Sequence, residues 1–480
     1  MYRIKIGFFR LKPVLFGVIL LFQLAVGESD AAEQKVGSDT ISYEGYTRFQ
    51  FRSRWGGGDK DRDLYQSLFL DIKPEDQQEP DWNFTALGHL SKDLDVGQGF
   101  SEFHDVYNSY RDSTDTRLYF GYLDINNLGF VNKDSRVKRI RLGRQDLLGT
   151  GQLLQFDGIR LDSRIFKEES RRIQLSVYGG DPVDYYNSDA SDSLFGVILQ
   201  SRPKDKLRLR LDWVEVEDKH NRANNFWPGV QVDNKDDFLA FSTWYSGWKN
   251  FKLHSRYTLL ESDVKKLHLR GSYSRPDRDL IASVSYSQLN NSILQYSNDF
   301  DPFFTTLSAL RPYHHTQVNL WKGLSENRSI DAGVSLRLLR DSSDDSLYNH
   351  DFKTFYLSHN TTGLRDGKVD LTLTMNYWSA SGRNDMITYG GQVDYHDNGD
   401  WKYSGGIYYD LYKYNDIVAV SNSTVGANFN TVAEKEDIYT YFVEAKWKRS
   451  AHRHLSFKFE YEAGQFSSYK TVRVGYTYRF

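Results

Sequence analysis

The sequence contains no cysteine, little proline and no long apolar run beyond its first residues. Its 480 residues include 0 Cys and 9 Pro. Without cysteine the chain cannot form a disulfide scaffold, a thiolate zinc site, an iron–sulfur cluster or a covalently attached c-type haem. Its mean hydropathy of -0.62 excludes a bundle of transmembrane helices, because each such helix needs roughly 20 mostly apolar residues.

The sequence is instead rich in aromatic residues. It has 33 Tyr, 30 Phe and 10 Trp, which together make up 15% of the chain. Disordered chains are poor in aromatic residues, so this composition indicates a folded protein. The formal net charge is -3, and nucleic acid is therefore not an expected partner.

The first 31 residues have the pattern of a secretory signal peptide. The apolar run 13–26 is too short to span a bilayer comfortably and has the length of a signal-peptide core. Small residues at 29–31 suit cleavage after Ala31, and those at 25–27 are a second candidate cleavage site. Four basic residues precede the apolar run: Arg3, Lys5, Arg10 and Lys12. We therefore expect a signal peptide over 1–31 and an exported chain over 32–480.

One pattern recurs along the exported chain: about ten residues in which every second position is apolar or aromatic, then a polar cluster. At the C-terminus, apolar residues alternate with polar ones such as Arg473 and Arg479. The apolar face there consists of Val472, Val474, Tyr476, Tyr478 and Phe480. Roughly 18–22 such strands are present, and a single-chain barrel is expected to have an even number. The alternation begins by Tyr43, which leaves no room for a separate plug domain.

Alternating strands also occur in soluble sandwiches, propellers and β-helices. Propellers and β-helices usually carry a sequence repeat, and only the hydropathy repeats here. In nearly every strand one face is apolar, often with aromatic ends, and the other carries Arg, Lys, Asp and Gln. That pattern is typical of a barrel with lipid outside and water inside, which must close because a bilayer cannot satisfy an open sheet edge. We predict an all-β fold: a transmembrane antiparallel β-barrel of about 18–22 strands.

The last strand carries a second signal. It ends on Phe480, with Tyr478 two positions earlier. This ending resembles the assembly signal of bacterial outer-membrane barrels. The resemblance implies a chain in the outer membrane of a Gram-negative cell, with the barrel assembly machinery, outer-membrane lipids and lipopolysaccharide as partners.

The stretch 136–164 resembles the alginate export family of outer-membrane porins. It contains Gly143-Arg144-Gln145 and then Phe156-Asp157-Gly158-Ile159-Arg160, like the Gly-Arg-Gln turn region and Phe-Asp-Gly-(Val/Ile)-Arg strand of that family. The resemblance implies a passive conduit with Arg144, Asp157 and Arg160 on or near the lumen wall.

Strand phase independently predicts arginines in the lumen. With Ile140, Leu142, Ile159 and Leu161 facing lipid, the residues between them face inward. The predicted lumen and selectivity residues are Arg48, Arg52, Arg139, Arg141, Arg160, Arg208, Arg210 and Arg270, joined by Arg144 and Asp157 from the resemblance. Guanidinium groups bind carboxylates and phosphates bidentately, so a ring of them in a pore favours anions. Alternatively, they brace the wall by pairing with acids such as Glu44, Asp157 and Asp162.

The remaining polar clusters predict no metal or cofactor site. The run 59–63 is rich in Asp and is expected to be an exposed loop tip, without the ligand spacing of a calcium loop. His314 and His315 lack a spaced third ligand and are expected to be a surface pair. No nucleophile motif or phosphate-binding loop is present.

We therefore expect a channel, a porin or exporter, for small or polymeric solutes that are anionic or saccharide. Two alternatives stay open. One is a barrel sheath for a periplasmic partner such as a multihaem cytochrome, with the redox groups on that partner because this chain has no cysteine. The other is an outer-membrane enzyme whose catalytic residues are distant in sequence.

Overall fold

The computed structural model describes most of the exported chain. The described residues are 34–36, 39–75, 81–95, 114–126, 136–147, 154–165, 172–183, 193–218, 234–260, 263–290, 311–344, 350–381, 385–397, 399–419, 429–448, 450–465 and 468–480. The predicted signal peptide, 1–31, lies outside them. In this described part of the chain, every helix is too short or too polar to cross a membrane.

The described residues form one antiparallel sheet of 23 strands. The strands are β1 (Gln34–Val36), β2 (Asp39–Gly56), β3 (Asp59–Pro74), β4 (Trp82–Asp93), β5 (Thr114–Asn126), β6 (Val137–Leu147), β7 (Leu154–Arg164), β8 (Arg172–Pro182), β9 (Ser193–Lys204), β10 (Leu207–Asp218), β11 (Asn234–Tyr245), β12 (Phe251–Leu260), β13 (Asp263–Arg275), β14 (Leu280–Leu289), β15 (Tyr313–Ser325), β16 (Arg328–Leu339), β17 (Phe352–Gly363), β18 (Val369–Ala380), β19 (Asp385–His396), β20 (Trp401–Ala419), β21 (Phe429–Lys448), β22 (Arg453–Ala463) and β23 (Ser468–Arg479). Among the described residues, three single turns of helix lie between strands: η3 (Pro276–Arg278), η5 (Ser342–Asp344) and α3 (Leu364–Gly367).

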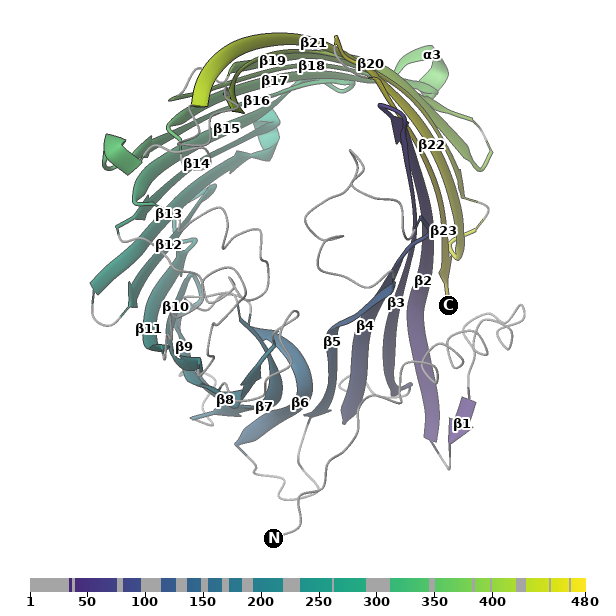
Figure 1. Ribbon diagram of the computed structural model, residues 1–480. Helices are drawn as coiled ribbons and strands as arrows, with labels where there is room; N and C mark the ends of the chain where they lie inside the picture. The colour runs from purple at the N-terminus through teal and green to yellow at the C-terminus, as the bar shows by residue number, and fades with distance from the viewer. Residues whose placement is uncertain are drawn as a thin grey trace, which may run out of the picture.

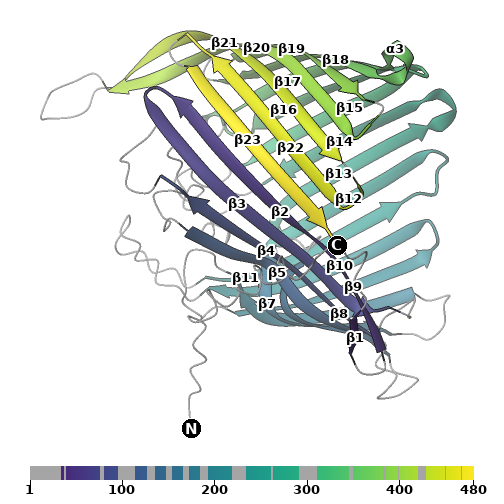
Figure 2. The ribbon, with the colours of Figure 1, turned by 90° about the vertical axis from the view of Figure 1, so that its right-hand side faces the viewer.

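The sheet closes on itself. Each strand from β2 to β23 pairs with its neighbour in sequence, and β23 returns to β2 in a ladder from Tyr46↔Arg479 to Gly56↔Tyr469. With β1 set aside as a short strand paired to β2, a closed ring of 22 strands remains. Figure 1 shows this ring and Figure 2 shows β2 beside β23. The predicted all-β antiparallel barrel is confirmed, with a strand number at the upper end of the expected range.

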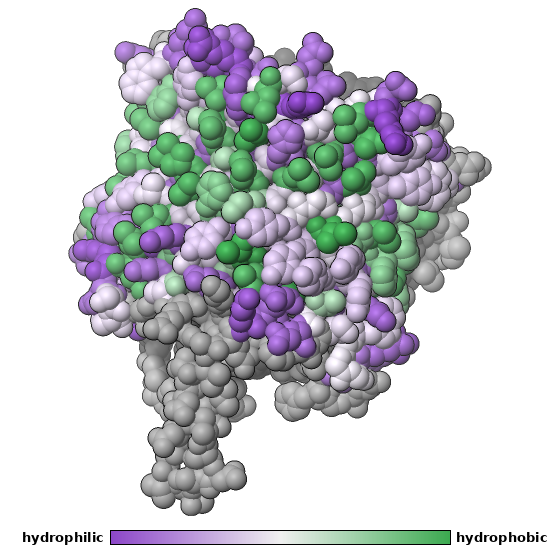
Figure 3. All heavy atoms as spheres, turned by 90° about the horizontal axis from the view of Figure 1, so that it is seen from above, coloured by the Kyte–Doolittle hydropathy of each residue, from purple (hydrophilic) through white to green (hydrophobic). Residues whose placement is uncertain are grey.

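The outer face of the barrel is apolar. Val474 and Val443 are 37% and 55% exposed, and Ile407 is 53% exposed, although all three lie in the middle of paired strands. Figure 3 shows hydrophobic side chains gathered over the outer face, with hydrophilic ones toward its margins. Successive side chains of a strand point to opposite faces, so the polar residues between these apolar ones line the inside.

Two breaks in the sequence alternation have different causes. Between 118 and 123 the ladder with β4 shifts from Leu87↔Phe120 to Gly88↔Leu118, so Tyr119 is an extra residue in a β-bulge. At Trp213 and Val214 the ladders on both sides are continuous. There the alternation is regular, and the inward-facing residue is itself apolar.

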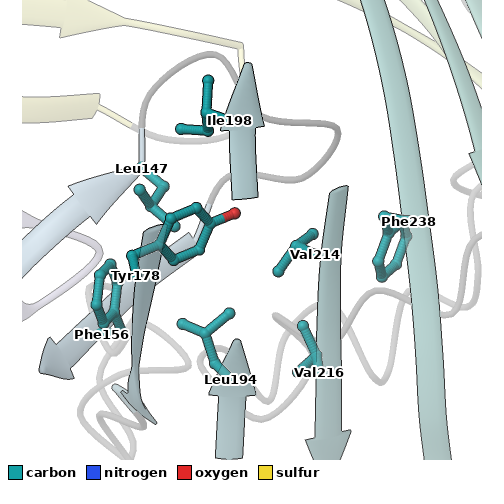
Figure 4. Close-up of a cluster of buried hydrophobic side chains, with 8 residues drawn as sticks. All are labelled: Leu147, Phe156, Tyr178, Leu194, Ile198, Val214, Val216 and Phe238. Atoms are coloured by element: carbon teal, nitrogen blue, oxygen red, sulfur yellow. The ribbon is translucent and has the colours of Figure 1, made fainter. Parts of the chain in front are cut away.

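Val214 belongs to an apolar cluster on the inner side of β6–β11. The cluster consists of Leu147, Phe156, Tyr178, Leu194, Ile198, Val214, Val216 and Phe238, each at most 5% exposed. Figure 4 shows Tyr178 beside Leu147 and Phe156, and the rings of Phe156 and Tyr178 lie 5.7 Å apart. Burial of these side chains favours folding, at roughly 1.5–3 kcal/mol for each large one.

A glycine shapes the wall beside this cluster. Gly143 has a φ of 116° and pairs with Gly158 of β7. A Cβ at position 143 would lie 2.4 Å from the carbonyl oxygen of Gly121. Only glycine adopts this conformation and fits this approach, which explains the glycine of the Gly-Arg-Gln motif.

The two ends of the barrel differ. The end that carries Phe480 has short connections, such as 205–206, 276–279 and 326–327. Connections at the other end include 94–113, 219–233 and 290–312, which are much longer. Bacterial outer-membrane barrels have short periplasmic turns and longer extracellular loops.

Candidate functional site

The inner wall is the candidate site, because the polar and charged side chains of a closed barrel converge there. The arginines predicted to line it fall into two groups. Among the described residues, those on β2–β7 are held by aspartates except Arg48, whereas Arg208 on β10 and Arg270 on β13 are not. This difference in partners decides what each group can do chemically.

The first group centres on β5–β7. Arg141 binds Asp124 through two hydrogen bonds, Nε to Oδ1 at 2.7 Å and Nη2 to Oδ2 at 2.8 Å. Its guanidinium also lies 3.7 Å from the ring centre of Tyr122. Arg139 and Arg160 both bind Asp162, the latter at 2.9 Å. These three predicted residues are inside the barrel, and the two aspartates neutralise two of their three positive charges.

Similar pairs join β2 to β3. Arg52 and Arg54 bind Asp63 and Asp61, each at 2.7 Å. The run 59–63 was expected to be an exposed loop, and this expectation is wrong: β3 begins at Asp59, and Asp61 and Asp63 are 5% and 7% exposed. A charged run alternating between Asp and Lys or Arg is compatible with a strand when arginines stand opposite.

Asp61 and Asp63 also lie close to Asp93, with one carboxylate oxygen of each within 4.8 Å of the others. Two of the three are already bound by arginines, which matches most of the negative charge. Arg48, also predicted for the lumen, lies on the same face as Arg52, with its guanidinium 5.9 Å from the ring centre of Tyr46.

Arg144 and Asp157 bind each other through two hydrogen bonds of 2.8 and 2.7 Å. Phe156 packs in the inner cluster, and side chains alternate along β7, so Asp157 lies on the opposite, outer side with Ile159. The structure therefore joins these two residues but places the pair away from the inward-facing arginines.

The remaining predicted residues lie on β10 and β13. Arg210 binds Asp212 at 2.7 Å. Arg208 lies over the ring of Trp244, 4.7 Å from its centre, and donates to Gln200 at 2.5 Å. A cavity of about 230 Å³ lies at this part of the wall. Its lining includes Arg208, Trp244, His254 and Arg270.

The strand register places further positively charged side chains and histidines beside Arg208, Arg210 and Arg270. One row of paired residues runs Arg210, Ser242, Arg256, His268, Ser287, His315 and Arg337 across β10–β16. A second row, on one side of this row, contains Arg208, His254 and Arg270. A third row, on its opposite side, contains Lys266. We call this set the cationic arc: Arg208, Arg210, His254, Arg256, Lys266, His268, Arg270, His315 and Arg337.

The cationic arc is poorly neutralised. Among the described residues, no carboxylate forms an ion pair with Arg208, Arg256, Lys266 or Arg270. Several buried polar atoms here also have no hydrogen-bond partner in the described part of the chain: Arg208 Nε, Ser242 Oγ, His254 Nε2 and Arg256 Nη2. Buried donors normally have partners, so these atoms indicate a place for water or an anion.

The sequence contained a signal for part of this arc. Lys266, His268 and Arg270 alternate with Leu267 and Leu269. That alternation shows that they share a face, but it does not show which residues of β12 or β16 lie beside them.

The wall formed by β19–β22 has the opposite character. There three inner lysines pair with acids: Lys402 with Asp394 at 3.3 Å, Lys446 with Glu444 at 2.8 Å and Lys458 with Glu460 at 2.6 Å. Further inward acids on these strands are Asp410 and Glu462. Among the described residues, unpaired positive charge is therefore greater on β10–β16, to the left in Figure 1, than on β19–β22.

His314 and His315 are adjacent but face opposite sides of β15. His314 Nδ1 lies 2.8 Å from the hydroxyl of Tyr286 on the outer face. His315 Nε2 lies 2.6 Å from Ser335 Oγ on the inner face. The two imidazoles cannot bind one metal ion together.

No protein-family model matches the chain, and no curated protein matches it. Three similar solved structures are a BenF-like porin from Pseudomonas fluorescens Pf-5, OccAB3 from Acinetobacter baumannii and the outer membrane protein opdK from Pseudomonas aeruginosa. Their sequences are 11%, 10% and 12% identical to this chain, with TM-scores of 0.45, 0.42 and 0.41. Each alignment covers 92% of this chain and 98%, 99% and 98% of the respective structure. At this level of similarity, function has to be argued from the inner wall itself.

Proposed function

We propose that this protein is an outer-membrane channel through which anionic solutes pass passively along the cationic arc. The observation that carries the proposal is the positive charge of Arg208, Arg256, Lys266 and Arg270 on one inner wall, which no carboxylate among the described residues pairs with. Guanidinium and ammonium groups facing a confined pore attract carboxylates and phosphates and raise their local concentration.

The outer-membrane location rests on three features. A closed barrel satisfies every strand edge, and its outer face is apolar. One end has short connections and carries the terminal Phe480, as expected for the periplasmic end. An export signal over 1–31 is part of the same proposal, as are lipopolysaccharide and the assembly machinery as partners.

The anionic solute is either a small organic acid or an acidic saccharide. The alginate export resemblance agrees with the second, but it rests on a stretch whose Arg144–Asp157 pair lies outside the lumen. The inward-facing charge of the proposal comes from other strands, so the proposal does not depend on that family.

Reversal potentials in planar bilayers under a salt gradient test the proposal. We expect the wild-type protein to prefer chloride over potassium, and Arg256→Gln with Lys266→Gln to reduce that preference. A matched control removes two positive charges from turns, Lys249→Gln with Arg278→Gln, and should change it little. Cation preference in the wild type, or an equal effect of both double variants, would refute an anion pathway along the arc.

The same recordings address the alternatives. A sheath for a partner protein would give unstable or unusually large conductance when the chain is alone. An enzyme would release product from a lipid or peptide substrate in the same sample, whereas a channel of the proposed kind would not.

A further inference from the structure

His268 and His315 occupy the middle of the cationic arc. In the row across β12–β16 they stand between Arg256 and Arg337, with Ser287 between the two histidines. Neighbouring strands are about 4.8 Å apart, so the two imidazoles are roughly 10 Å apart and each is beside an arginine.

Both imidazoles have a hydroxyl as partner. His268 Nδ1 lies 2.8 Å from Ser287 Oγ, and His315 Nε2 lies 2.6 Å from Ser335 Oγ. A serine hydroxyl can donate to a neutral imidazole and accept from a protonated one. Each histidine can therefore gain or lose its proton without losing this hydrogen bond.

The other charged groups around them are mainly basic. Facing His268 are His254 and Arg256 from β12 and Lys266 and Arg270 from its own strand, while β14 contributes serines. The ring of His254 lies 5.8 Å from that of His268.

His315 is beside Arg337 of β16, and its ring lies 5.8 Å from that of Phe352. The acid on that side is Asp351, which accepts the backbone N–H of Leu339. Protonation of either histidine thus adds positive charge to a wall that is already positive.

Other inner histidines either lie outside the arc or have different partners. His89 of β4 lies outside the arc, with its Nδ1 3.0 Å from Ser67 Oγ. His396 binds the carboxylate of Asp370 at 2.9 Å, so a proton there is matched by a negative charge. His254 stacks on Trp244, with ring centres 4.9 Å apart.

We propose that His268 and His315 make the anion preference of this channel depend on pH, with stronger preference in acid. The inference rests on the proposed function, because it concerns the same arc. Acid favours the protonated form of a histidine, whereas the arginines and the lysine stay charged throughout the pH range of the test. The arc therefore combines fixed charges with two charges that acid adds.

The test measures the ratio of chloride to potassium permeability at about pH 8 and about pH 5. One unit charge roughly 10 Å from a permeating ion changes its local concentration about twofold in water-like surroundings. We expect the wild-type ratio to rise about two- to fourfold in acid. His268→Gln with His315→Gln should abolish most of that rise.

His314→Gln is the matched control, because that side chain is the neighbour of His315 but faces outward; it should keep the full rise. His268→Arg gives a fixed charge and should raise the ratio at about pH 8 and flatten its pH dependence. Heat-modifiable mobility on gels checks that each variant forms the barrel.

A rise of equal size in the double variant would assign the pH dependence to other titratable groups, carboxylates or the remaining histidines, and overturn the inference. So would a wild-type ratio that prefers anions equally at both pH values, which would leave the proposed function intact. Cation preference at both pH values would instead refute the proposed function.

Discussion

The Asp124–Arg141 pair predicts a large loss of stability when its carboxylate is removed. The side chains of Asp124 and Arg141 are 6% and 14% exposed, and two hydrogen bonds of 2.7 and 2.8 Å join them. Arg139 keeps Asp162 as a second partner, so the loss falls mainly on Arg141. Breaking a buried pair by removing one partner costs about 3–5 kcal/mol, and we expect Asp124→Asn to lower the free energy of unfolding by about 3 kcal/mol.

Urea unfolding in detergent micelles, followed by tryptophan fluorescence, measures this change. Glu44→Gln is the control, because its partner Lys73 is 37% exposed and Glu44 itself 64% exposed. Exposed pairs contribute about 0–1 kcal/mol. Asp124→Asn combined with Arg141→Gln removes both charges, so it should recover part of the lost stability and leave the reversal potential unchanged. A loss below about 1 kcal/mol for Asp124→Asn would contradict the view that these arginines brace the wall.

Three further changes test the fold. Gly143→Ala should destabilise the barrel by at least about 1–3 kcal/mol in the same urea assay. The φ of residue 143 is 116°, and the new Cβ would meet the Gly121 carbonyl. An unchanged urea midpoint would refute this prediction. Phe238→Ala should cost about 3–5 kcal/mol, because this 2% exposed side chain would leave a cavity in the inner cluster; a loss below about 1 kcal/mol would argue against it. Phe480→Ala should reduce the fraction of protein that reaches the heat-modifiable barrel form in cells, with little effect on in vitro stability, if the terminal aromatic acts in assembly. Its ring lies 6.2 Å from that of Tyr43, so a large loss of purified-barrel stability would instead indicate a packing role.

The fold was largely predictable because alternation is a local property. Apolar residues at every second position determine which face of a strand meets lipid, and this can be seen within one segment such as 472–480. The interpretation of β7 failed at Asp157 because the family resemblance placed it in the lumen, whereas the phase set by Ile159 and Leu161 already placed it outside.

The candidate site was predicted less well because register is not local. Sequence shows that Arg256 and His268 face inward, but only the ladder between β12 and β13 shows that they are neighbours. In the same way, nothing within the run 59–63 reveals that Arg52 and Arg54 stand opposite its aspartates. The sequence therefore predicted a ring of equivalent arginines around the pore. In the structure, some of these arginines bind aspartates and others do not.

That division connects stability with selectivity. An arginine paired one to one with an aspartate adds no net charge to the pore, as for Arg52 with Asp63 and Arg141 with Asp124. Arg139 and Arg160 share Asp162, so together they add one positive charge instead of two. Arg256 and Lys266 have no such partner among the described residues, and their field extends into the lumen. A substitution that removes a bracing arginine should therefore change the urea midpoint more than the reversal potential, and one that removes a residue of the arc should do the reverse. If the two kinds of substitution changed both quantities in proportion, ion selectivity would follow the total number of arginines and not their strand partners.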